Sequence, residues 1–279
     1  MFCDLHAHSI FSDGSYTPTE LIEEAKRLRL SAIALTDHNT TKGLPEFLKA
    51  AKELSVTAVA GTELSTDYDG VELHILGLFL PKEACGRVEE RVQILKRNKD
   101  ESNRILCERL ALAGYEISFE EVKKSSPTGF VNRALIGELL TEKGYTSSIQ
   151  NALDSLLRKG GEFYAEPKRL DALETVAFLK GLGAVAVLAH PFLNVDEKGL
   201  RKFLDEAVER GLDGIETRCS VYAKEQTELS EKIAEEYGLL KSGGSDFHGR
   251  RKPNVSLGVG KGNLAVPTEF YEKLREKTV

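Results

Sequence analysis

The 279-residue sequence lacks any apolar run that approaches the roughly 18 residues needed for a membrane-spanning helix. Its first residues also lack the basic start and the apolar stretch of a secretory signal. We therefore expect a cytoplasmic protein without a membrane partner. Hydrophobic residues make up 41% and charged residues 29% of the chain, which is typical of a globular protein with a substantial core.

Cysteines are few and scattered along the chain. None of the four belongs to a Cys-x-x-Cys pair, so the sequence suggests neither a disulfide framework nor a thiolate zinc site. We expect buried free thiols at Cys3, Cys85, Cys107 and Cys219.

Positive charge is not in excess. The chain has 38 Lys and Arg against 44 Asp and Glu, a net charge of −6. This balance argues against coating of nucleic acid by electrostatics alone, but it is compatible with small phosphorylated substrates held at metal ions. Residues 83–165 contain 13 basic and 13 acidic side chains, so the rest of the chain carries the whole −6, which divalent cations would offset.

Short apolar runs alternate with amphipathic helical stretches in two parts of the chain, which is typical of a parallel sheet covered by helices. The predicted strands are 2–5, 32–36, 57–61, 184–188, 214–217 and 239–242. Between these parts, the runs 63–66 and 71–80 flank a turn-like segment at 67–70 and predict a hairpin or an excursion from the sheet. Residues 83–165 are mostly helical, so we predict a discontinuous domain of residues 1–82 and 166–279 with a helical insertion at 83–165.

All six histidines lie in or directly after predicted strands, five of them at the C-terminal end. In parallel β/α folds, ligands and catalytic groups gather at that face. His6 and His8 lie two residues apart on a strand, so both imidazoles can turn toward one ion, and Asp246 with His248 repeats this spacing. The remaining candidates are His38, His74, His190 and Glu63.

Each of these residues also has an ordinary structural interpretation. A lone histidine such as His74 is equally well explained as a core or surface residue. Asp37 is better explained as a helix N-cap or as a hydrogen-bond partner of a ligand, and Asp13 as a turn residue. The joint pattern favours a metal site, because core packing gives no reason to place every histidine near one end of a barrel.

The chain resembles the PHP (polymerase and histidinol phosphatase) family of metal-dependent phosphoesterases. The matching elements, in order, are His6-Ala7-His8-Ser9 with Ser12-Asp13-Gly14, Thr36-Asp37-His38, Gly61-Thr62-Glu63, His74, Ala189-His190-Pro191 and Gly244-Ser245-Asp246-Phe247-His248-Gly249. The chain is most similar to stand-alone members that act on nucleoside 3′,5′-bisphosphates and short oligonucleotides. The resemblance implies an α/β fold, a distorted (β/α)7 barrel of the PHP type with a mainly helical insertion.

The resemblance also implies two to three divalent metal ions, Zn, Mn or Fe. The first would be bound by His6, His8, Glu63 and Asp246, the second by Glu63, His74 and His190, and the third by Asp13, His38 and His248. Asp13 stands where other branches of the family carry a histidine. Mixed nitrogen and oxygen ligation independently favours these metals over Ca or Mg. The residues expected to be catalytic are Glu63, Asp246 and His190.

The expected reaction is hydrolysis of a phosphomonoester by a metal-bridging hydroxide, with nucleoside 3′,5′-bisphosphate as the favoured substrate. Two ions roughly 3.5–4 Å apart can generate such a hydroxide near neutral pH. No nucleophilic side chain is then required, in agreement with the lack of a Gly-x-Ser-x-Gly elbow and of a P-loop.

Arg133 and Arg218 are the candidate phosphate-binding residues, because a guanidinium can bind phosphate oxygens in pairs. An exposed helix charge is the ordinary interpretation of Arg133. Members of the family often carry an Arg-Pro-His type run before this helix, where the chain reads Pro127-Thr128-Gly129-Phe130. This difference removes a cation expected for the second phosphate.

Three other functions stay open. A 5′–3′ exonuclease acting on short oligonucleotides would need a basic, aromatic-lined path, and the neutral insertion offers only aromatic residues: Tyr115, Phe119, Phe130 and Tyr145. A histidinol phosphate phosphatase would use the same metal site. A non-catalytic metal-binding PHP module is disfavoured by the intact ligand set. The expected partner is a small phosphorylated molecule, a nucleotide by preference, and no obligate protein partner is evident.

Overall fold

The computed structural model describes residues 2–125 and 131–278. The chain divides into two compact units, Met1–Glu90 with Leu170–Val279, and Arg91–Arg169. This division falls within a single long helix, α3 (Cys85–Leu112), whereas the predicted limits of the insertion were 83 and 165. Those limits stay a prediction.

The first unit contains nine strands and six α-helices within the described residues. The strands are β1 (Phe2–Cys3), β2 (Ile33–Leu35), β3 (Ala58–Tyr68), β4 (Val71–Leu78), β5 (Leu170–Asp171), β6 (Val185–Ala189), β7 (Gly214–Cys219), β8 (Leu240–Gly244) and β9 (Val266–Pro267). The helices are α1 (Pro18–Leu28), α2 (Leu44–Leu54), α7 (Ala172–Gly181), α8 (Glu197–Ala207), α9 (Lys224–Glu236) and α10 (Thr268–Arg275).

Helix α1 begins as its sequence predicts. The Thr17 hydroxyl accepts a hydrogen bond from the Glu20 backbone N–H at 3.1 Å, and the Glu20 carboxylate accepts one from the Thr17 N–H at 2.7 Å. This capping box satisfies two donors that a helix N-terminus otherwise leaves unpaired.

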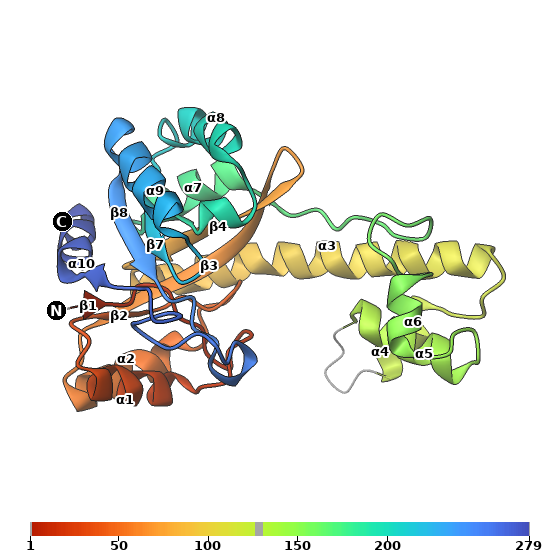
Figure 1. Ribbon diagram of the computed structural model, residues 1–279. Helices are drawn as coiled ribbons and strands as arrows, with labels where there is room; N and C mark the ends of the chain where they lie inside the picture. Colours follow the sequence, from red (N-terminus) through yellow and green to blue (C-terminus); the bar gives the residue numbers. More distant parts are fainter. Residues whose placement is uncertain (1, 126–130, 279) are drawn as a thin grey trace. The chain divides into compact units, whose positions relative to one another are not determined.

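The main sheet is mixed and strongly curled (Figure 1). Its strand order is β2-β3-β4-β6-β7-β8, with β5 paired to β3. Strand β4 runs antiparallel to both of its neighbours, while the β2/β3, β6/β7 and β7/β8 pairs are parallel. The predicted hairpin is therefore confirmed as β3–β4, and it is an integral part of the sheet. The segments 57–61 and 63–66 form one strand, because the first turn residues come only at Asp69 and Gly70.

The segment that follows β1 lies between the two edge strands of this sheet. Asp4 pairs with Ile33 of β2, and the Leu5 N–H donates to the Gly243 carbonyl of β8 at 3.1 Å. Gly244 is required here, since a Cβ at this position would clash with His6. The chain thus carries an α/β fold whose sheet curls back on its first segment. The sevenfold (β/α)7 count stays a prediction.

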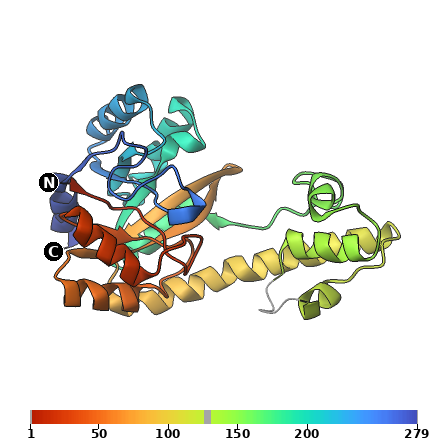
Figure 2. The same ribbon diagram turned by 60° about the horizontal axis from the view of Figure 1, so that its bottom comes forward.

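Helices cover the outside of the curled sheet. Helices α1 and α2 lie side by side in both views (Figures 1 and 2), and they pack near β2 and β3. Helix α7 packs on β3, β4 and β6, whereas α9 packs on β7 and β8. The sheet interior contains a buried apolar cluster from alternate strand positions, which includes Leu5, Ala34, Val59, Leu76 and Val187. The same strands end in polar residues.

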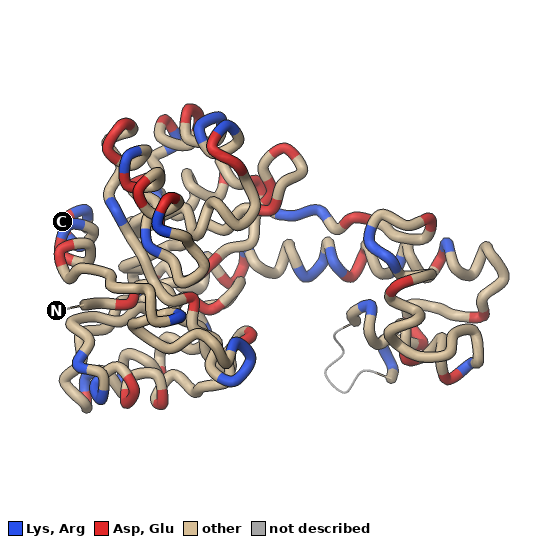
Figure 3. The backbone as a smooth tube through the Cα atoms, in the orientation of Figure 1, with Lys and Arg blue, Asp and Glu red and all other residues tan. Residues whose placement is uncertain are grey.

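The second unit is helical and has a core of its own. It comprises most of α3 together with α4 (Phe119–Ser125), α5 (Arg133–Glu142) and α6 (Ile149–Asp154). Buried residues such as Leu106, Leu110, Ile136 and Leu140 form its core. Basic and acidic residues are interspersed along it (Figure 3). The whole Pro127–Phe130 run lies outside the described residues.

Within the described part of the chain, no helix has both the length and the apolar character that crossing a membrane requires.

Candidate metal centre

All nine predicted metal ligands meet at one end of the curled sheet. They form four overlapping groups, and within each group the ligand atoms lie within 4.8 Å of one another. His6, His8 and His38 follow the first two strands, Glu63 and His74 lie on the hairpin, and the others follow β6 and β8 or lie in the loop before α1. The groups are His8, Asp13, His38 and His248; His6, Glu63 and His190; His6, His8 and Asp246; and His38, Glu63 and His74.

Glu63 lies at the centre of the cluster and is fully buried. Its two carboxylate oxygens face different imidazoles. The Oε2 atom lies 3.1 Å from His6 Nε2, 3.2 Å from His8 Nε2 and 3.1 Å from His38 Nδ1. The Oε1 atom lies 2.8 Å from His74 Nδ1 and 3.0 Å from His190 Nε2. Glu63 is thus positioned to be shared between two neighbouring cations.

Two aspartates extend the cluster on either side of His8. Asp246 Oδ1 lies 3.2 Å from His8 Nε2 and 3.7 Å from His6 Nε2. Asp13 Oδ2 lies 3.2 Å from His248 Nε2 and 3.9 Å from His38 Nε2. The observed groups follow the predicted ligand sets only in part, because His74 and His190, assigned to one ion, fall in different groups. The ligand sets stay a prediction. The groups overlap more than those sets, because His38 approaches both Glu63 and Asp13.

The backbone at two of these residues is strained. His190 has a φ of 26° and Asp246 a φ of 55°, in the left-handed region that residues other than glycine rarely adopt. Such conformations persist where the surroundings impose them, and they cluster at functional sites. In the loop that carries Asp13, Gly14 is required because a Cβ there would clash with the His8 carbonyl.

The donor set fits divalent cations. Both ring nitrogens of His8 and the Nδ1 atom of His38 are buried and make no hydrogen bond to the described residues. Buried polar atoms in proteins are normally satisfied, and a cation would satisfy these nitrogens together with the buried carboxylates. The nitrogen and oxygen donors suit Zn, Mn or Fe.

The ionisation of the cluster without metal points the same way. Burial opposes protonation of His6, but the Glu216 and Glu63 carboxylates outweigh it and raise the pKa of His6 well above its ordinary value. Burial would also raise the pKa of Glu63, yet the surrounding imidazoles hold this pKa well below the usual range. Burial lowers the pKa of His38 to about 4. The carboxylates thus favour positive charge at His6, whereas burial keeps His38 in the neutral form in which an imidazole binds metal.

A sequence model of the PHP domain family matches residues 4–164, more than half of the 279-residue chain. The chain belongs to the PHP family. The predicted resemblance is thereby confirmed.

Three relatives that match most of this chain carry the names of hydrolytic enzymes. A 5′-3′ exoribonuclease of Haemophilus influenzae is 30% identical over 88% of this chain and 89% of its own length. A phosphoribosyl 1,2-cyclic phosphate 1,2-diphosphodiesterase of Eggerthella lenta is 32% identical over 93% of this chain and 99% of its own. A 3′,5′-nucleoside bisphosphate phosphatase of Chromobacterium violaceum is 27% identical over 88% and 86%.

A solved structure from Bifidobacterium adolescentis, of a protein predicted to be a metal-dependent phosphoesterase, superposes with a TM-score of 0.72 at 26% identity. The alignment covers 99% of this chain and 96% of that one. The chain is therefore a hydrolytic enzyme, a metal-dependent phosphoesterase of the PHP family.

Glu216 is a residue of this PHP site that the sequence analysis missed. It is fully buried on β7, and its carboxylate accepts hydrogen bonds from His6 Nδ1 at 3.0 Å and from the His190 backbone N–H at 2.7 Å. Carboxylates that bind the outer nitrogen of a ligating histidine fix its tautomer and orientation. The sequence places Glu216 on a predicted strand, but it gives no sign that the side chain faces the cluster.

Three further residues support the site. Asp37 accepts hydrogen bonds from the Ser9 N–H at 2.7 Å and the Ser12 hydroxyl at 2.7 Å, so it holds the loop that follows His8. The sequence analysis did not single out Asp4 or Lys252. Buried Asp4 accepts the Ser245 and Gly258 N–H groups, and Lys252 Nζ lies 2.7 Å from Asp246 Oδ2.

The two predicted phosphate-binding arginines are not among the clustered residues. The Arg218 guanidinium lies 3.0 Å from the Glu231 carboxylate, donates to the Ala265 carbonyl and stacks over Phe270. Arg133 belongs to the second unit, where it donates to the Leu157 carbonyl and lies over Tyr164. Their binding of phosphate stays a prediction.

Proposed function

We propose that this chain hydrolyses a phosphomonoester and that its favoured substrate is a nucleoside 3′,5′-bisphosphate. The observation that carries the proposal is the buried Glu63 carboxylate, whose oxygens lie 2.8–3.2 Å from five imidazoles. A carboxylate shared in this way suits two metal ions held side by side, which is the arrangement used for displacement at phosphorus. Glu63, Asp246 and His190 are accordingly the proposed catalytic residues.

We further propose that the cluster binds two to three Zn, Mn or Fe ions. When bound, such ions lower the pKa of water and offset the negative charge of phosphoryl oxygens. Glu216 holds His6 with its Nε2 atom toward Glu63, and Lys252 holds the outer oxygen of Asp246. In the reaction, a water oxygen bonds to phosphorus, the ester P–O bond breaks, and the leaving alkoxide takes up a proton.

Several finer assignments belong to the same proposal. The curled sheet with residues 4–8 would complete a distorted (β/α)7 barrel, and residues 83–165 would be its insertion. Arg133 is proposed to bind phosphate because positive charge gathers around it. Lys99 reports this positive charge through its pKa. Partial burial lowers the pKa of Lys99, and the nearby Arg133 and Lys159 charges lower it further.

A 5′–3′ exonuclease on short oligonucleotides is the second candidate, because a relative that matches over most of its length carries this name. It would use the same metal cluster and differ only in the groups that bind the leaving strand. Another relative is named a phosphoribosyl 1,2-cyclic phosphate 1,2-diphosphodiesterase, and a cyclic phosphate has two ester bonds at phosphorus where a phosphomonoester has one.

The proposal is tested by phosphate release from 3′-phosphoadenosine 5′-phosphate, histidinol phosphate and a short oligoribonucleotide. Mn-loaded wild type is compared with Glu63→Ala. We expect turnover of the bisphosphate that the variant loses. Preference for the oligonucleotide would replace the phosphatase by the nuclease, and inactivity of the loaded wild type on all three would overturn the proposal in favour of a metal-binding module or another substrate.

A further inference from the structure

A cavity of about 270 Å³ lies beside the metal cluster, at the ends of β7 and β8. It is bordered by Leu193, Asp246 and Lys252, which also line a second cavity of about 300 Å³. This second cavity exposes three of the cluster histidines: His38, His74 and His190. The two cavities therefore adjoin along three shared residues, and a molecule that reaches the histidines in one can extend into the other.

The wall of the first cavity combines apolar and cationic groups. Leu193 and Val221 are large apolar residues that are nevertheless 49% and 40% exposed. Lys252 and Lys261 bring positive charge to the same cavity, and Lys252 already pairs with Asp246. For the Lys261 ammonium group, no carboxylate partner is found among residues 2–125 and 131–278. Apolar walls with a few directed polar groups are typical of small-molecule sites.

The loop that carries these lysines is anchored to the barrel. The Asn263 side-chain amide donates to the Ser220 and Tyr222 carbonyls at 3.3 and 3.4 Å, directly beside Val221. The Gly258 N–H donates to buried Asp4 at 2.7 Å, and Asp4 in turn holds Ser245. The wall is thus fixed before any ligand arrives, which lowers the ordering cost of binding.

We propose that this cavity binds the leaving group of the substrate, a phosphorylated nucleoside. The base and sugar would pack on Leu193 and Val221, while the phosphate that does not react would pair with Lys261. This inference rests on the proposed function and names its leaving-group site. Lys261 would then be a phosphate-binding cation in the unit that holds the metal ligands, which is the role predicted for Arg218.

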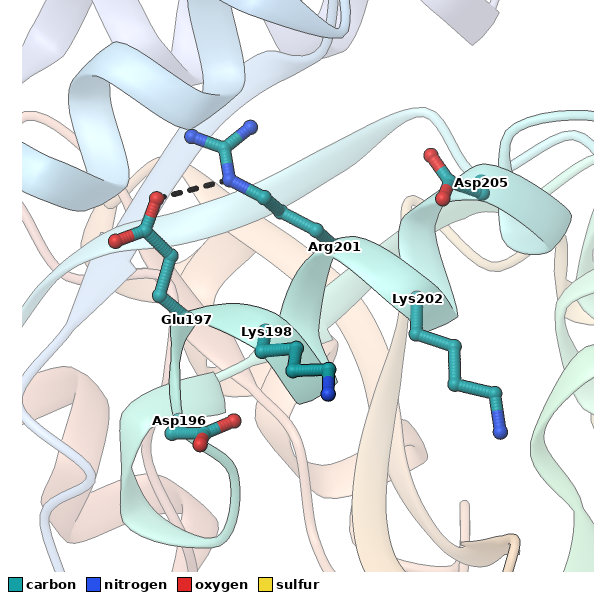
Figure 4. Close-up of a pocket in the computed structure, with 6 residues that line it drawn as sticks. All are labelled: Asp196, Glu197, Lys198, Arg201, Lys202 and Asp205. Atoms are coloured by element: carbon teal, nitrogen blue, oxygen red, sulfur yellow. Dashed lines mark hydrogen bonds and ion pairs between the residues drawn. The ribbon is translucent and has the colours of Figure 1, made fainter.

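A third, larger cavity on the same unit serves as a contrast. It measures about 660 Å³ and is formed by α8 and the residues before it (Figure 4). Two of its three basic residues are already paired: Arg201 contacts Glu197 at 2.9 Å and Glu236 at 2.7 Å, and Lys202 pairs with Asp69. None of its lining residues is in a metal-ligand group of the described chain. It provides matched controls.

The test compares two substrates that share the reacting phosphate but differ in the leaving group, 3′-phosphoadenosine 5′-phosphate and glycerol 2-phosphate. Val221→Asp should raise KM for the nucleotide about tenfold or more, because a charged carboxylate replaces part of the apolar wall on which the base and sugar pack. Hydrolysis of glycerol 2-phosphate should change less than about twofold. Lys261→Ala should raise KM for the bisphosphate and leave KM for adenosine 3′-phosphate unchanged. The control variants are Lys198→Ala in the larger cavity and Val208→Asp at an exposed valine directly after α8, and both should resemble wild type.

The inference and the proposed function can fail separately. If wild type cleaves the nucleotide and Val221→Asp has an unchanged KM, the leaving-group site is wrong and the function stands. If wild type cleaves only glycerol 2-phosphate, the proposed substrate is wrong. The same 3′-phosphoadenosine 5′-phosphate is then tested as an inhibitor of glycerol 2-phosphate hydrolysis. Equal inhibition of wild type and Val221→Asp would overturn the cavity as a nucleotide site, whereas weaker inhibition of the variant would support it.

Discussion

Replacing Glu216 by glutamine keeps its size and exchanges one acceptor oxygen for an amino group that donates. The carboxylate accepts from both His6 Nδ1 and the His190 backbone N–H. A glutamine can accept only one of these two bonds. If it keeps the backbone bond, its amino group faces His6 Nδ1 and moves the ring proton to Nε2. That nitrogen lies 3.1 Å from Glu63 Oε2 and is the one available to a metal.

The expected cost follows from this exchange. Loss of such a supporting partner typically lowers metal affinity by about 10- to 100-fold, or about 1.4–2.7 kcal/mol. Calorimetric titration of the metal-free protein with Mn, with a competing chelator, measures the affinity directly. Phosphate release should fall by the same factor at limiting metal and recover at saturating metal.

Glu231→Gln is the matched control, because Glu231 pairs with Arg218 rather than with a histidine of the cluster. It should bind Mn as wild type does. If Glu216→Gln remained folded and bound Mn within about twofold of wild type, the account of how His6 is held would be wrong.

Three other predictions concern the loop, the metal and the thiols. Asp37→Asn should loosen the Ser9–Asp13 loop, lower the free energy of unfolding by about 1–3 kcal/mol in urea titrations, and release metal first from the group that contains Asp13; unchanged stability would contradict this. Chelation should lower the melting temperature, since ligand at 100 times its Kd stabilises by about 2.7 kcal/mol; a calorimetric scan without a shift would exclude a bound metal. Burial raises the pKa of Cys3, Cys107 and Cys219 to about 12. Because the folded state holds these protons more tightly than the unfolded chain, this contribution to stability is complete below pH ~8.5 and is lost as pH rises toward 12. Alkylation at pH 8 should therefore label Cys85 before the others in peptide mass spectra, and equal labelling would refute the buried assignment.

The elements that the sequence predicted well are those with local signals. The capping residues Thr17 and Glu20 specify the start of α1, and the whole signal lies within four consecutive residues. The alternation of apolar runs predicted β6, β7 and β8 within one or two residues of their observed bounds. The mixed character of the sheet was not predicted, because it depends on the antiparallel pairing of β4 with β6, which lies more than a hundred residues away.

By itself, the sequence determined which residues can bind metal. His6 and His8 lie on one strand, Asp246 and His248 have the same spacing, and strand periodicity turns each pair toward one side. Only the tertiary structure decided what supports and surrounds them. Glu216, Asp4 and Lys252 act on partners brought to them by the curl of the sheet, and the same curl directs Arg218 to Glu231. The reason is physical: a strand's period is local, whereas the partner of a buried charge depends on which distant segments pack against it.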